Sequence, residues 1–106
     1  MRRGMTMLLF LVVLVPLGAR AQALDDRQRL GMRLFNQSCR VCHVKPQLAS
    51  PQFAPALSKD TLGGNDEALR AFIANGSARM PGFKTHFRPE EIDAIAAYLR
   101  TLGPPN

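Results

Sequence analysis

The 106-residue chain contains no tryptophan and only two cysteines, Cys39 and Cys42. A disulfide between them would close so small a loop that it would constrain the unfolded chain very little, which makes it a poor structural staple. A chain of this length also buries proportionately little of its surface on folding. We therefore expect something other than side chains alone to help fill the core.

Long apolar runs are missing as well. The longest, Met7–Val15, has nine residues, against roughly 20 for a helix that spans a bilayer. Two arginines precede this run and small residues at alternate positions follow it, which is typical of a secretory signal peptide. The sequence predicts that residues 1–21 are a leader, with cleavage after Ala21 or alternatively after Ala23.

Removal of the leader leaves residues 22–106 as one domain, exported to the periplasm or an equivalent compartment and without a stable membrane anchor. Three of the 14 basic residues leave with it (Arg2, Arg3 and Arg20), while all 8 acidic residues remain, so the formal charge falls from +6 to +3. Neither a run of lysine and arginine nor a basic helical stripe is present, and we expect no nucleic-acid partner.

Three helices are predicted from apolar residues that recur at spacings of three and four, and no alternating strand pattern competes with them. The first covers residues 25–38 and starts at an aspartate cap. The second covers residues 66–75, with Asn65 as its cap, and the third starts at Pro89 and ends before Gly103. The sequence therefore predicts an all-α domain.

The connection between the first two helices, residues 44–64, contains three prolines and no helical pattern. A connection of about 20 residues is uncommon in a small compact domain unless it has a surface on which to pack. A flat apolar ligand would supply that surface and would also supply the missing core.

The most distinctive element is "SCRVCHV" at residues 38–44, in which two residues separate two thiols and a histidine follows at once. Unrelated thiols beside a surface histidine are one interpretation. A thioredoxin-like dithiol is another, although it requires the pair to open a helix after a strand. Structural zinc requires four ligands, and the adjacent side chains of Cys42 and His43 do not easily face one tetrahedral ion.

Covalent haem attachment explains the spacing better, because Cys-x-x-Cys-His is its sequence signature. Each thiol adds to one vinyl group on neighbouring pyrroles, and two intervening residues let both sulfurs reach them. The next residue, His43, then presents its imidazole to the iron as the proximal ligand. The expected cofactor is therefore one covalent haem c, attached through Cys39 and Cys42.

With this motif the sequence resembles the class I cytochrome c family, and the resemblance covers nearly all of the mature chain. In that family a glycine and an aromatic residue lie at four-residue intervals before the first haem cysteine, and Gly31, Phe35 and Cys39 have this spacing. In the family they pack against an aliphatic and an aromatic residue of the C-terminal helix, a pair that Ile95 and Tyr98 resemble.

A second similarity lies after the haem motif. The family has a Gly-Pro-x-Leu segment whose proline carbonyl accepts a hydrogen bond from the proximal histidine. The segment "APAL" at residues 54–57 is similar, with Ala54 where glycine is usual. The resemblance implies that Pro55 accepts this bond from His43, which would fix the ring and raise its basicity.

A third similarity precedes the last helix. The family supplies a methionine from a loop there, often followed by proline, and "ARMPGF" at residues 78–83 is similar. The resemblance implies Met80 as the distal iron ligand. His86 is the alternative imidazole, since the chain has only two histidines.

The resemblance implies a small cytochrome c fold, with about three helices and long loops packed around one covalently attached haem. It also implies a one-electron carrier, not an enzyme, that meets a donor and an acceptor redox protein transiently. One alternative is a permanent haem subunit of a periplasmic dehydrogenase or oxidase complex. The other is a Cys-x-x-Cys thiol-disulfide oxidoreductase.

Overall fold

The computed structural model of the chain describes residues 23–47 and 49–105. The predicted leader, residues 1–21, lies outside the described residues. Within them the order of elements is α1 (Asp26–Ser38), α2 (Arg40–His43), the 3-10 helix η1 (Thr61–Gly64), α3 (Asp66–Asn75) and α4 (Pro89–Leu99). The described part of the chain contains helices and connecting segments but no strand, which confirms the all-α prediction.

Side-chain caps fix where α1 and α3 begin. The Asp25 carboxylate accepts a hydrogen bond of 2.7 Å from the Gln28 backbone N–H, and Gln28 Oε1 accepts one of 3.0 Å from the Asp25 N–H. At α3, Asn65 Oδ1 accepts a bond of 3.0 Å from the Ala68 N–H. These contacts satisfy N–H groups that have no partner within the helix. Both caps confirm the predicted starts.

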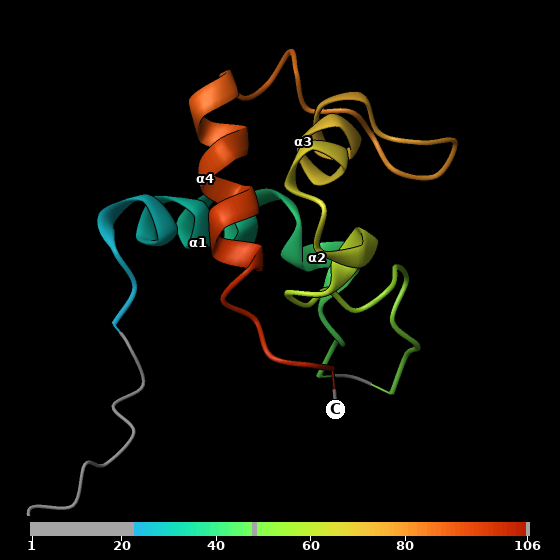
Figure 1. The fold of residues 1–106 in the computed structure, drawn as a ribbon. Helices are drawn as coiled ribbons and strands as arrows, with labels where there is room; N and C mark the ends of the chain where they lie inside the picture. The colour runs from blue at the N-terminus through green and yellow to red at the C-terminus, as the bar shows by residue number, and fades with distance from the viewer. Residues whose placement is uncertain (1–22, 48, 106) are drawn as a thin grey trace, which may run out of the picture.

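The crossing of α1 and α4 organises the domain, with α3 on one side of α4 (Figure 1). At the crossing, a Cβ built on Gly31 would lie only 1.9 Å from the Ala94 carbonyl oxygen and 2.9 Å from the Tyr98 Cβ. Glycine is therefore required, because any side chain would force the helices apart. One turn further along α1, the Phe35 and Tyr98 rings lie 5.6 Å apart between centroids, in a tilted contact.

The core lies between α1, α3 and α4. The buried cluster contains aromatic, aliphatic and thiol side chains: Phe35, Cys39, Leu69, Ile73, Phe87, Ile92, Ile95, Ala96 and Leu99. The predicted pair on the last helix packs as expected: Tyr98 contacts Phe35, and Ile95 lies in the same buried cluster as Phe35. The backbone of Ala94, which was not predicted, comes nearest to Gly31.

Two helical elements were not predicted, and one prediction of an end was wrong. The last four residues of the Cys-x-x-Cys-His motif form the short helix α2, and η1 precedes α3. The last helix ends at Leu99, before the expected stop at Gly103, and the chain continues in a turn in which the Leu102 N–H donates to the Leu99 carbonyl at 3.1 Å. Leu102 still packs on the core from this turn.

Candidate haem-binding site

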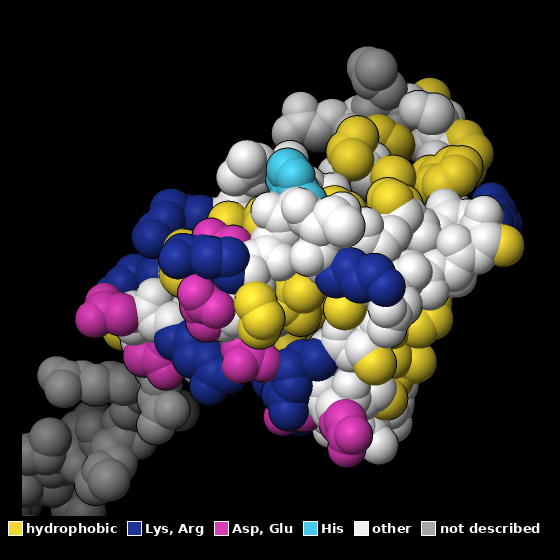
Figure 2. Space-filling view, turned by 90° about the horizontal axis from the view of Figure 1, so that it is seen from above, with side chains coloured by type: hydrophobic (Ala, Val, Ile, Leu, Met, Phe, Trp, Pro, Cys, Tyr) yellow, Lys and Arg dark blue, Asp and Glu magenta, His cyan; other side chains and the backbone are white. Residues whose placement is uncertain are grey.

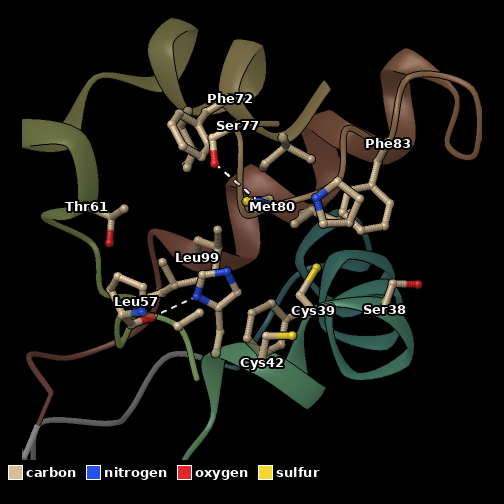
Figure 3. A pocket seen from close by; sticks show the side chains of 18 of the residues that line it. Ser38, Cys39, Cys42, Leu57, Thr61, Phe72, Ser77, Met80, Phe83 and Leu99 are labelled. Atoms are coloured by element: carbon tan, nitrogen blue, oxygen red, sulfur yellow. Dashed lines mark hydrogen bonds between the residues drawn. The ribbon is translucent and has the colours of Figure 1, made fainter. Parts of the chain in front are cut away.

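A cavity of about 620 Å³ opens beside the core, which is within the range of roughly 300–1,000 Å³ for cofactor sites. Its walls come from α1, α2, α3, α4 and the segments that follow α2 and α3. Its lining is mostly apolar, but it includes all five residues that the sequence singled out: Cys39, Cys42, His43, Pro55 and Met80. Figure 3 shows Cys39 and Cys42 on one side and Met80 and Phe72 on the other.

The two cysteines reach the cavity from adjoining helices. Cys39 follows the last residue of α1 and is buried, while Cys42 is half-buried on α2. The His43 N–H donates to the Cys39 carbonyl at 3.1 Å, so one helical turn carries the whole motif. This turn is what lets thiols separated by two residues face one cavity.

The His43 ring is fixed by the segment that follows α2. Its Nδ1 lies 2.8 Å from the Pro55 carbonyl oxygen. A carbonyl can only accept, so Nδ1 carries a proton, and in the neutral ring Nε2 is then the nitrogen whose lone pair can bind a metal. The Ala54 N–H donates to the Cys42 carbonyl at 2.9 Å and thereby holds Pro55 in place. The pattern "APAL" thus forms the predicted contact despite the alanine at position 54.

The segment after α3 presents Met80. Gly76 turns the chain at φ 69°, and the Ser77 N–H donates to the Met80 carbonyl at 2.9 Å. The Ser77 hydroxyl oxygen lies 3.3 Å from the Met80 N–H and accepts from it. The Phe83 N–H donates to the Ile73 carbonyl at 3.0 Å, so the segment folds back on α3. Met80 is consequently half-buried at the cavity wall.

His86, the alternative ligand, lies elsewhere. Its side chain is exposed and does not line the cavity. Its ring lies 4.7 Å from that of Phe87 and 6.2 Å from that of Phe83, measured between centroids, in edge contacts. The structure therefore brings Met80, and not this imidazole, together with His43.

The Cys39 thiol does not have the lowered pKa that favours thiol-disulfide exchange. Burial, and secondarily the charge of Cys42, raises the pKa of the Cys39 thiol to about 11. A thiol-disulfide enzyme needs a lowered pKa, commonly from a helix N-terminus after a strand. Both cysteines are free thiols in the structure. Thiols held in an apolar wall suit addition to a ligand in the cavity better than disulfide exchange.

Several lining residues were not predicted from the sequence. Large apolar side chains of the described residues remain exposed at Val41, Phe53, Leu62 and Phe72, and all of them line the cavity. Leu62 has a positive φ of 55°, a conformation that is rare for a residue other than glycine. No local sequence pattern marks these positions, because their common property is the space that they face.

Apart from Arg79, which lines the cavity, charged side chains lie mainly on other parts of the surface. Figure 2 shows basic and acidic groups interspersed over one part of the face, with apolar side chains gathered at the other end. Ion pairs join Arg70 to Asp93 at 3.3 Å and Arg88 to Glu90 at 3.4 Å, both between exposed or half-exposed groups. Such pairs contribute little to stability. Within residues 23–47 and 49–105, no helix is long and apolar enough to cross a membrane.

Comparison with known proteins agrees with this geometry. Residues 26–99 match the family model of the cbb3-type cytochrome c oxidase subunit III. Cytochrome c6 of Leptolyngbya boryana is 32% identical over 73 residues, which cover 65% of this chain and 85% of that protein. The cbb3-type cytochrome c oxidase subunit FixP of Bradyrhizobium sp. (strain ORS 278) is 38% identical over 77 residues, which cover 69% of this chain but 27% of that protein.

A solved structure shows the same fold. Cytochrome c6 from the diatom Phaeodactylum tricornutum aligns with a TM-score of 0.54 and 23% identity, covering 69% of this chain and 90% of that one. The chain belongs to the class I c-type cytochromes. It is a monohaem electron carrier, and its cofactor is one covalently bound haem c. The residues present fit this cofactor, since paired thiols, a ring with a free Nε2 and a thioether line one apolar cavity.

Proposed function

We propose that the chain is an exported, freely diffusing carrier in which Cys39 and Cys42 attach the haem by thioether bonds. In this proposal His43 and Met80 bind the iron from opposite sides. The observation that carries the proposal is the shared cavity, in which His43 is held by Pro55 on one wall and Met80 lies on another. Its donor and acceptor are redox proteins that bind transiently, and the chain converts no substrate.

Each side chain has a definite part in this function. When bound, haem c supplies an iron that takes up and releases one electron. The Pro55 carbonyl orients the His43 ring and raises the basicity of Nε2. The soft thioether of Met80 favours the reduced state and so raises the reduction potential. The apolar walls of the cavity keep water from the iron ligands. A redox partner can approach at the exposed mouth of the cavity.

The ligand assignment is tested by substitution in the ferric holoprotein. The protein should show the weak far-red band of sulfur-to-iron charge transfer, and Met80→Ala should abolish it and lower the potential. His86→Ala is the matched control and should leave both unchanged. If instead His86→Ala alters the spectrum while Met80→Ala does not, the iron has two histidine ligands and the assignment is wrong.

Export and leader cleavage belong to the same proposal. They are supported by the basic start, the short apolar run and the small residues before Gln22. Intact mass of the periplasmic protein should equal residues 22–106, or 24–106 after the alternative cut, plus one haem. A mature protein that retains Met1 would contradict leader cleavage. A haem that extracts into acidic organic solvent would contradict its attachment through thioether bonds.

A second function has one specific observation in its favour. The family model and the relative FixP are named for a subunit of a cbb3-type oxidase. We therefore keep as the alternative a permanent haem subunit of an oxidase or dehydrogenase complex. Gentle purification separates the two, because a carrier elutes alone at low molecular mass and a subunit elutes with a catalytic chain.

A further inference from the structure

Two separate segments face each other across the mouth of the cavity. One follows α2 and contains Phe53 and Pro55. The other, the Met80 segment, follows α3 and contains Arg79 and Met80. The Cζ atom of Arg79 lies 5.3 Å from the centroid of the Phe53 ring. A guanidinium over an aromatic face at this distance is attracted by the ring quadrupole. The contact therefore joins the segment of the proximal contact to the segment of the distal thioether.

Other contacts hold the Met80 segment on one side only. The Ser77 N–H to Met80 carbonyl bond and the Phe83 N–H to Ile73 carbonyl bond lie within the segment or join it to α3. Among the hydrogen bonds, ion pairs and aromatic contacts of the described residues, the Arg79–Phe53 pair is the one that links the two segments. Without it, no polar or aromatic contact among the described residues joins the Met80 segment to the opposite rim.

The Arg79 guanidinium is available for the contact with Phe53. Ion pairs within the described part of the chain engage other arginines, and Arg79 takes part in none of them. Lys84, the next cation along the chain, instead donates to Asn75 Oδ1 at 3.4 Å, beside the end of α3.

We propose that Arg79 and Phe53 form a bridge across the cavity mouth that limits opening of the Met80 segment. The bridge thereby sets how readily a small neutral ligand of the imidazole class replaces the thioether. Arg79 and Phe53 are positioning residues, since they act through Met80. The inference rests on the proposed ligation by Met80, and the experiment separates the two.

The measurement is imidazole binding to ferric holoprotein, followed as loss of the far-red band after rapid mixing. At saturating imidazole the rate becomes that of opening. Arg79→Gln and Phe53→Leu should each raise this limiting rate by about two- to five-fold, the range set by an exposed cation–π contact. Arg79→Lys and Phe53→Tyr keep a cation and a ring, and their rates should stay near that of the wild type.

A double variant tests whether the two substitutions act on one contact, and a variant at Lys84 tests the effect of charge alone. Because both substitutions break one contact, Arg79→Gln combined with Phe53→Leu should open no faster than the faster single variant. Lys84→Gln removes the same charge without touching the bridge and should leave the rate unchanged. Equal acceleration by Lys84→Gln and Arg79→Gln, or full additivity in the double variant, would overturn the bridge.

The spectrum of the wild-type protein separates failure of the Met80 ligation from failure of the Arg79–Phe53 bridge. A wild-type protein without the far-red band would refute ligation by Met80, and the inference would fall with it. A wild-type protein that shows the band, with unchanged limiting rates in Arg79→Gln and Phe53→Leu, would refute the bridge alone.

Discussion

Replacement of Gly31 by alanine tests the helix crossing most directly. The new Cβ would lie 1.9 Å from the Ala94 carbonyl oxygen and 2.5 Å from its carbon. Both are backbone atoms of α4, so no side chain can rotate away to relieve the clash. An ordinary contact needs at least 3.4 Å, and the helices must therefore separate by about 1.5 Å.

The magnitude follows from two opposing effects. A gap of roughly 0.5–1 Å already removes a quarter to a half of the dispersion energy of a contact, and the Phe35–Tyr98 pair lies one turn away. Overpacking of this kind costs about 1–3 kcal/mol, and an immovable backbone places it at the upper end. Alanine regains about 1 kcal/mol of helix propensity. The net loss of unfolding free energy should be about 2 kcal/mol.

Guanidinium unfolding of the holoprotein, followed by far-ultraviolet circular dichroism, measures this loss. The melting temperature should also fall, by about 8–16 °C for a domain of this size. Gly103→Ala is the matched control, because nothing lies within 4 Å of a Cβ there, and its stability should stay within about 0.5 kcal/mol of the wild type. If Gly31→Ala is as stable as the wild type, the close crossing is wrong.

Three further outcomes are expected. Gly76→Ala should weaken or remove the far-red band, because φ is 69° and the Cβ would lie 2.3 Å from the Met80 carbonyl oxygen, whereas Gly64→Ala, at φ 75° in open space, should keep it; equal spectra would count against this. Hydrogen bonding to Arg100 is the main cause that lowers the pKa of Asp66 below 3.8, so the pair stabilises the fold above that pH. The stability lost in Asp66→Asn should therefore be largest at neutral pH and vanish on acidification, and a pH-independent loss would contradict it. Haem-free protein should show no cooperative thermal transition by circular dichroism, and a sharp one would show that the core is complete without haem.

The sequence predicted α1, α3 and α4 because their signals are local. Asp25 and Asn65 accept the expected cap bonds, and Gly76 ends α3 as expected. The end of α4 was placed late because Leu102 keeps the apolar spacing, although it packs from a turn and not from a helix. The four residues of α2 are too few to show a helical period.

The site was accessible to prediction where it depends on a motif. Cys39, Cys42 and His43 are neighbours in sequence, and Pro55 and Met80 were reached through the family pattern. The structure brings all five to one cavity. The walls that they share could not be predicted, because the lining depends on which segments meet in space.

The contacts that hold His43 on one side of the cavity differ in strength from those that hold Met80 on the other. On the proximal side, two thiols and an imidazole lie within one helical turn, and a 2.8 Å bond fixes the ring of His43. On the distal side, Met80 lies 37 positions away in sequence, on a segment tied to α3 at its ends. With the proposed ligation, weakening of the contacts on the distal side should therefore release Met80 before His43. We accordingly expect substitutions in residues 39–43 to affect mainly the retention of the haem, and substitutions around Met80 to affect mainly the reduction potential.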